Sequence, residues 1–149
     1  PCLLHQPRYN LFERWVEDGL LEVLAREGVG CIAYSPLAQG ALTDKDLGGI
    51  PQGSRASRAG TTVGQRYLSE EKLEKIRRLH SIALERGQSL AQMALAWCYR
   101  CAPVSTLIIG ASRLSQIDDN LKAMGNTNFS AEELARIDEI LVPYAREAY

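Results

Sequence analysis

The sequence predicts an α/β fold built on a parallel sheet. Short apolar segments at residues 2–6, 30–34 and 106–109 alternate with longer segments in which apolar residues recur at helical spacing. Strands that alternate with helices pair in parallel through right-handed crossovers, and continuous apolar runs indicate strands buried on both faces. The expected order is strand, helix, strand, long loop, two helices, strand and two helices. With only three strands, the expected architecture is an arc of a larger sheet.

Composition is typical of a globular protein with a real core. The chain has 149 residues, enough for one domain, and 46% of them are apolar. Lys and Arg (17) balance Asp and Glu (18), so no net field favours nucleic acid or an anionic membrane. No apolar run reaches the length of a membrane span. We therefore expect neither a nucleic-acid partner nor a membrane partner.

The start of the chain and its cysteines indicate its context. Pro1 is not an initiator methionine, and the chain opens inside the apolar run Cys2-Leu3-Leu4, which predicts a piece of a longer protein. No secretory signal pattern opens the sequence. Three of the four cysteines lie in apolar stretches, as reduced thiols commonly do, which predicts a cytoplasmic location.

Two strands and one helix are expected before residue 38. The first strand covers residues 2–6, and the second covers residues 30–34 and is closed by Ser35-Pro36. The helix between them ends at Gly28, as helices commonly do at glycine. Its apolar side contains Leu20, Leu21 and Leu24.

A long loop follows the second strand. From residue 38 to residue 68 the periodic patterns give way to Gly, Ser, Arg and Thr. Loops of this length are unusual inside a compact domain and are generally functional or disordered. Lys45, Arg55 and Arg58 in this loop are either solvated charges or phosphate clamps.

Two helices come next. Ser69 is the expected N-cap of the first, which has acidic residues in its first turn and ends at Gly87. Ser89 caps the second, which runs until Pro103. The apolar stripe of the first helix contains Leu73, Ile76, Leu79, Ala83 and Leu84, and the inward residues of the second are Met93, Ala94, Trp97, Cys98 and Cys101.

A third strand and two final helices complete the chain. The strand covers residues 106–109 and ends at Gly110. Ser130 and Glu133 form a capping box that predicts the start of the last helix. The apolar positions are Ile117, Leu121 and Met124 in the first of these helices, and Leu134, Ile137, Ile140 and Leu141 in the second.

The best candidate for a ligand site follows the third strand, because ligands of parallel α/β folds bind at the carboxyl ends of strands. Gly110 leads through Ser112 and Arg113 into a helix, and free backbone N–H groups, a hydroxyl and a guanidinium suit a phosphate. One turn on, Gln116, Asp119 and Asn120 share a helix face that could bind an adenine edge or ribose hydroxyls. The alternative is a capped helix with a solvated polar face.

Other reactive residues have plainer explanations. Cys98 and Cys101 form a lone C-x-x-C on one helix face, which indicates core cysteines rather than zinc or redox chemistry, and no metal site is expected. His5 and His80 have no evident partner in the sequence and are expected to be structural. Tyr9, just beyond a strand, either stacks on a flat ring or packs in the core.

Four motifs in order carry a family resemblance. The segments Gln6–Leu11, Gly28–Gly40, Gly49–Arg55 and Ile108–Asn120 resemble the second half of aldo-keto reductases. The most similar branch contains potassium-channel beta subunits and bacterial glyceraldehyde-3-phosphate reductases. The resemblance implies part of a (β/α)₈ TIM barrel, with residues 1–149 forming its last three strands, their helices and the C-terminal helix.

The resemblance also implies an NADP(H) site and a role for each matching residue. Gln6 matches the contact to the nicotinamide carboxamide, and the 38–68 loop matches the segment that covers the cofactor through Lys45 and Arg55. The pyrophosphate loop matches Tyr34, Ser35, Pro36, Leu37, Ala38 and Gln39. The pocket for the 2′-phosphate and adenine matches Gly110, Ser112, Arg113, Gln116, Asp119 and Asn120.

Two departures from the family pattern stand out in this pocket and beside it. Position 119 is commonly glutamate in this branch, and aspartate shortens the reach toward the adenosine. The aromatic residue that stacks on the nicotinamide in other branches has two candidates here, Tyr34 and Tyr9.

No catalytic residue is assigned to this chain. The family's proton-donor tyrosine, with its aspartate, lysine and histidine partners, lies on strands of the first half, and none of those segments is present in this sequence. The resemblance implies that the intact barrel reduces small aldehydes or ketones with NADPH. This chain alone is expected to be inactive.

Two alternatives remain beside the reductase. One is an NADP(H)-binding regulatory subunit that resembles the potassium-channel beta subunits. Segments Gln39–Thr43 and Arg86–Leu95 resemble the bacterial reductases more and favour the enzyme. The other is a half-barrel that self-associates through its open sheet edges. The expected partner is thus the N-terminal half of the barrel or a second copy.

Overall fold

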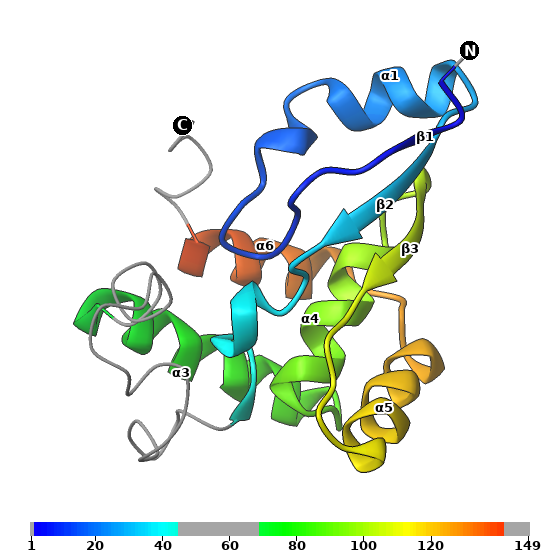
Figure 1. Cartoon of the computed structure of the whole chain (residues 1–149). Helices are drawn as coiled ribbons and strands as arrows, with labels where there is room; N and C mark the ends of the chain where they lie inside the picture. The colour runs from blue at the N-terminus through cyan, green and yellow to red at the C-terminus, as the bar shows by residue number, and fades with distance from the viewer. Residues whose placement is uncertain (1, 45–68, 142–149) are drawn as a thin grey trace.

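The computed structural model describes residues 2–44 and 69–141, and its elements follow the order that the sequence predicts (Figure 1). Short 3-10 turns supplement the strands and helices. In chain order the elements are β1 (Leu4–His5), η1 (Trp15–Glu17), α1 (Leu20–Arg26), β2 (Gly30–Tyr34), η2 (Ala38–Gly40), α3 (Glu70–Glu85), α4 (Leu90–Tyr99), β3 (Val104–Ile108), α5 (Leu114–Leu121), η5 (Lys122–Gly125) and α6 (Ala131–Leu141).

The three strands form one parallel sheet in the order β1-β2-β3, which confirms the predicted pairing. Leu4 of β1 pairs with Gly30, and Tyr34 at the end of β2 pairs with Ile108. Figure 1 shows the arrows of β2 and β3 pointing the same way. The carboxyl ends of all three strands therefore meet at one edge of the sheet.

The prediction that the strands are buried on both faces is wrong. Leu4 of β1 is 53% exposed, and in β3 only Val104 is buried, while Ile108 is 46% exposed. In β2, Cys31 and Ala33 lie in the core, whereas the alternate residues Gly30, Ile32 and Tyr34 are partly exposed. Because β1 and β3 are the two edges of this sheet, their apolar side chains lack the neighbours that a wider sheet would supply.

The helix boundaries follow the predicted caps. Ser69 Oγ accepts the Lys72 N–H at the start of α3, and Ser89 and Gln92 form a capping box at α4. Ser130 and Glu133 form the predicted capping box at α6. After α1 and α3 the chain turns at Gly28 and Gly87, both in the left-handed region that favours glycine.

Helix α4 is at the centre of the core. Its inward residues Met93, Ala94, Trp97 and Cys98 are fully buried, as predicted. The prediction that this helix runs until Pro103 with Cys101 on its inward side is wrong, because α4 ends at Tyr99 and Cys101 lies beyond it, partly buried. It contacts β3, α3 and α5, and α3 in turn contacts α6. One predicted position of the α3 stripe is wrong, because Leu84 is 62% exposed and Ile82 is buried in its place.

Helix α5 carries an apolar face that no described residue covers. Its large apolar residues point into solvent, together with Met124 of η5. The exposed fractions are 73% for Leu114, 41% for Ile117, 61% for Leu121 and 52% for Met124. We call these four residues the α5 apolar face.

Within the described ranges, no helix is long and apolar enough to cross a membrane.

Candidate functional site

The residues predicted to bind a cofactor lie after neighbouring strands. Gln6 follows β1 and is exposed, Ser35 follows β2, and Gly110 follows β3. The parallel pairing of β1 and β2 continues past the strand end, where the Tyr34 N–H donates to Pro7 O at 3.0 Å. The fold therefore brings three segments far apart in sequence to a single edge of the sheet.

The loop after β2 has a strained backbone. Ser35, Ala38 and Gln39 all have positive φ, at 54°, 48° and 59°. Each such residue that is not glycine costs on the order of 1–2 kcal/mol, and such strain clusters at functional sites. Pro36 and Ala38 are buried and shape the loop, whereas Gln39 is exposed and accessible to a ligand.

Hydrogen bonds within the segment from Ser35 to Asp44 fix its turns, and its far end is bound to α4. Ser35 O accepts the Ala38 N–H at 3.0 Å, and Leu37 O accepts the Leu42 N–H at 3.2 Å. At the far end, Asp44 Oδ1 accepts the N–H of Leu90 at the start of α4 and lies 3.7 Å from His80 Nε2. His80, expected to be structural, thus has an acidic partner that the sequence does not reveal.

The segment after β3 has three donors aimed at one oxygen. Gln116 Oε1 accepts from Ser112 N–H at 2.8 Å, from Ser112 Oγ at 3.2 Å and from Arg113 N–H at 3.3 Å. The arrangement is that of an anion cradle at a helix start, with a side-chain oxygen in the place of an anion. Ser112 and Arg113 are exposed, so a phosphate could reach these donors by displacing the Gln116 carboxamide.

The three polar residues predicted to share a face of α5 have different surroundings. The Asp119 carboxylate accepts from Gln92 Nε2 at 2.8 Å and from Ser89 Oγ at 3.4 Å, which ties α5 to the start of α4. Asn120 is 9% exposed and packs inward. Gln116 is therefore the member of the set that lies against the phosphate-type donors.

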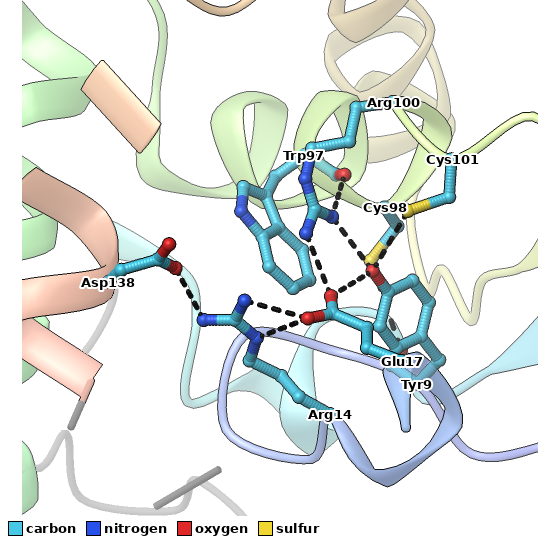
Figure 2. Close-up of polar contacts among 8 residues, drawn as sticks. All are labelled: Tyr9, Arg14, Glu17, Trp97, Cys98, Arg100, Cys101 and Asp138. Carbon is cyan, nitrogen blue, oxygen red and sulfur yellow. Dashed lines mark hydrogen bonds and ion pairs between the residues drawn. The ribbon is translucent and has the colours of Figure 1, made fainter. Parts of the chain in front are cut away.

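A polar cluster behind the sheet edge was missed by sequence reasoning (Figure 2). Glu17 lies between two guanidinium groups and accepts from Arg14 Nη2 and from Arg100 Nη2, both at 2.7 Å. Tyr9 donates its hydroxyl to Glu17 at 2.6 Å, and Arg14 also reaches Asp138 of α6 at 2.6 Å. We call these residues, with Trp97, the Glu17 cluster. Only the Arg14–Glu17 spacing was visible in the sequence.

The Glu17 cluster resolves the alternatives for Tyr9. The Tyr9 ring is fully buried and packs on Trp97 with centroids 5.3 Å apart, so Tyr9 is a core residue. Burial raises the pKa of its phenol far above the usual range. Burial acts in the same direction on Glu17, but hydrogen bonds from Arg14, Tyr9 and Arg100 outweigh it and hold the pKa of Glu17 below its usual value.

Tyr34 remains the other predicted candidate for the aromatic residue that stacks on the nicotinamide. It is partly exposed at the end of β2, and the Arg8 guanidinium lies 5.4 Å from its ring centroid. Lys45, Arg55 and Arg58 lie outside the described residues. Cys98 is buried, as predicted, and burial raises the pKa of its thiol; all four cysteines are free thiols.

Comparison with known proteins gives consistent matches. Residues 1–142 match the family described as Aldo/keto reductase family. L-glyceraldehyde 3-phosphate reductase of Escherichia coli (strain K12) is 50% identical over 143 residues, which are 93% of this chain and 41% of the reductase. A probable voltage-gated potassium channel subunit beta of Arabidopsis thaliana is 42% identical over 125 residues, 82% of this chain and 38% of that subunit.

The solved structures agree. A glycerol dehydrogenase from Gluconobacter oxydans has 26% sequence identity and a TM-score of 0.76, and the match covers 98% of this chain and 44% of the dehydrogenase. The chain thus spans about 41% of the length of the curated reductase that it matches. The similarity confirms the predicted architecture, an arc of a TIM barrel.

Proposed function

The chain belongs to the aldo/keto reductase family, and from that premise we propose that it is the cofactor-binding portion of an NADPH-dependent reductase of small aldehydes or ketones. The observation that carries the proposal is a set of three donors after β3 that converge on one oxygen: Ser112 N–H, Ser112 Oγ and Arg113 N–H. The strand β2, which pairs with β3, leads into the strained loop. Convergent donors at an exposed helix start bind phosphate groups well.

Each segment of the strand edge has a proposed task. Ser112 and Arg113 hold the 2′-phosphate in the place of the Gln116 carboxamide, and Gln116, Asp119 and Asn120 shape the adenosine end of the pocket. The loop from Tyr34 to Gln39 holds the pyrophosphate, and Gln6 orients the nicotinamide through its carboxamide. The 38–68 segment covers the cofactor, with Lys45 and Arg55 on its phosphates. When bound, the cofactor supplies a hydride for a carbonyl carbon.

The acid that protonates the developing alkoxide comes from outside this chain in our proposal. Tyr9 is unsuited to that task, because its hydroxyl is buried between Glu17 and Arg100 and its pKa is raised. We therefore propose that the remaining part of a barrel supplies the acid, and that the 149-residue chain alone does not turn over a carbonyl substrate.

Cofactor titration of the chain tests the proposal. NADPH should bind at micromolar concentration, followed by the change in its fluorescence. Arg113→Glu should weaken NADPH binding about tenfold or more and leave NADH binding unchanged, because a charge-assisted contact to the 2′-phosphate is replaced by repulsion. Arg26→Glu, on an exposed arginine of α1, is the matched control and should have no effect. Equal loss of NADH and NADPH binding would contradict the proposed 2′-phosphate site.

A regulatory NADP(H)-binding subunit is the second candidate, supported by the 42% identity to the potassium channel subunit. The 50% identity to the bacterial reductase favours the enzyme. A protein that holds this chain in a complete barrel separates the two: rapid carbonyl-dependent oxidation of NADPH supports a reductase, and tight binding with negligible turnover supports a regulatory subunit. The four free thiols support our proposal of a reducing, cytoplasmic location.

A further inference from the structure

Two of the proposed cofactor-binding segments, the one after Gln6 and the loop after β2, are joined by buried hydrogen bonds. The Tyr34 N–H donates to Pro7 O at 3.0 Å, and the Tyr9 N–H donates to Tyr34 O at 3.3 Å. The chain after Gln6 therefore runs beside the end of β2 and reaches the strained loop at Asn10. Pro7, Tyr9 and Asn10 are all buried, so this junction lies beneath the surface.

The Asn10 side chain makes the last contact of this junction. It is 0% exposed, and its Nδ2 donates to Ser35 O and to Glu13 Oε2, both at 3.0 Å. Its Oδ1 accepts from Phe12 N–H at 2.9 Å and from Glu13 N–H at 3.1 Å. Two donors and two acceptor contacts use the whole hydrogen-bonding capacity of an amide, so the side chain has one defined orientation.

The partner of Asn10 is the first strained residue of the loop. Ser35 has a φ of 54°, and its carbonyl accepts from Asn10 Nδ2 and from the Ala38 N–H, both at 3.0 Å. A serine leaves the left-handed region readily unless its surroundings fix it there. The Asn10 amide is a side-chain contact that holds the Ser35 carbonyl in that orientation.

We propose that Asn10 is a positioning residue of the cofactor site. It sets the strand-end loop from Ser35 to Gln39 at a fixed place relative to Gln6, four residues before it in the chain. Asn10 touches no ligand itself, because its side chain is fully buried. The inference rests on the proposed function and deepens it. In this role the Asn10 amide fixes the distance between Gln6, the proposed nicotinamide contact, and the proposed pyrophosphate loop.

A paired substitution tests this role. Asn10→Asp keeps the shape of the side chain and replaces the amide that donates to Ser35 O and to Glu13 Oε2 by an oxygen. Asn126→Asp is the matched control, because Asn126 Nδ2 donates to another backbone carbonyl, Arg86 O at 3.3 Å, away from the strand-end loops. Both variants of the whole 149-residue chain are titrated with NADPH and with adenosine 2′-monophosphate, and their thermal midpoints are measured.

The two ligands distinguish a specific effect on the position of the strand-end loop from a general destabilisation of the fold. Adenosine 2′-monophosphate reaches only the segment after β3. Asn10→Asp, which removes both Nδ2 hydrogen bonds, should therefore weaken NADPH about tenfold or more and leave adenosine 2′-monophosphate unchanged. Asn126→Asp should change neither affinity. Adding Ser35→Gly to Asn10→Asp should restore part of the NADPH affinity, because glycine adopts the left-handed conformation without strain.

The remaining outcomes contradict one proposal or both. Equal weakening of both ligands by Asn10→Asp, or no weakening of either, overturns the role of Asn10 while the cofactor site stands. An unmodified chain that binds neither ligand overturns the proposed function and the role of Asn10 with it. If Asn10→Asp does not fold, Asn10→Ser, whose hydroxyl is too short to reach Ser35 O, takes its place in the same assay.

Discussion

Glu17 is a charged side chain that is held largely inside the molecule by its partners. Its side chain is 23% exposed and is bonded to Arg14, Arg100 and Tyr9. Arg100 also stacks on Trp97 at 3.6 Å from the ring centroid. The cluster joins the segment after β1 to α4 and, through Asp138, to α6 (Figure 2). The Glu17 cluster thereby holds the segment that contains Asn10 against α4.

Glu17→Gln should lower the free energy of unfolding by roughly 2 kcal/mol at pH 7, because two partly buried guanidinium groups lose a charged acceptor. The pKa of Glu17 is lowered in the folded state, so its contribution is complete above the ordinary value of 4.5. That contribution is lost as the pH falls through the lower, folded pKa. Urea unfolding between pH 7 and pH 3 should show the difference between wild type and variant shrinking as acid is added.

Glu27→Gln is the control for this residue. Its carboxylate pairs with Arg26 on the surface, where both side chains are more than half exposed, so the change should cost well under about 1 kcal/mol at any pH. A pH-independent loss in Glu17→Gln would contradict the role given to the charge.

At the scale of elements, the helix caps differ in what they hold. Ser89 Oγ accepts the Gln92 N–H at 3.2 Å and also donates to Asp119 of α5. Ser69 Oγ accepts the Lys72 N–H at 3.3 Å, on the exposed start of α3. A serine N-cap thus closes the start of α3 at Ser69, whereas the serine N-cap of α4 at Ser89 also joins α4 to α5.

Ser89→Ala should therefore lower the free energy of unfolding by about 1–2 kcal/mol, and Ser69→Ala by about half of that. Equilibrium unfolding in urea measures both. Equal losses in the two variants would mean that the contact between Ser89 and Asp119 adds nothing.

At the scale of the whole molecule, the main feature is the apolar surface that the described residues leave uncovered. The α5 apolar face and Leu4 of the edge strand β1 are exposed in one chain. Contiguous exposed apolar surface is a common cause of association. Leu4 lies on an edge of the sheet, where backbone groups also pair readily.

The double substitution Ile117→Lys with Leu121→Lys should reduce the self-association of the chain and its binding of a hydrophobic dye. Sedimentation velocity and dye fluorescence measure the two effects. Leu84→Lys is the matched control, since Leu84 is 62% exposed but lies on α3, apart from this face. A wild-type chain that is monomeric and binds no dye would contradict the expectation.

The sequence by itself determined the element order, the parallel pairing, the helix caps and the core of α4. These features depend on local signals: apolar periodicity fixes the buried side of a helix, and Ser89 or Ser130 closes its own helix start whatever surrounds it. The strand-end position of Gln6, Ser35 and Gly110 followed from the same signals, because parallel strands place their carboxyl ends together.

Only the tertiary structure decided which apolar residues are covered and which polar residues meet. Leu4 and Ile117 have the same apolar character as buried residues, and their exposure depends on whether a neighbouring element lies against them. Asn10 meets Ser35 across 25 residues, and Glu17 meets Arg100 across 83. No local pattern encodes such contacts, because they form only when the sheet and helices have brought distant segments within hydrogen-bonding distance.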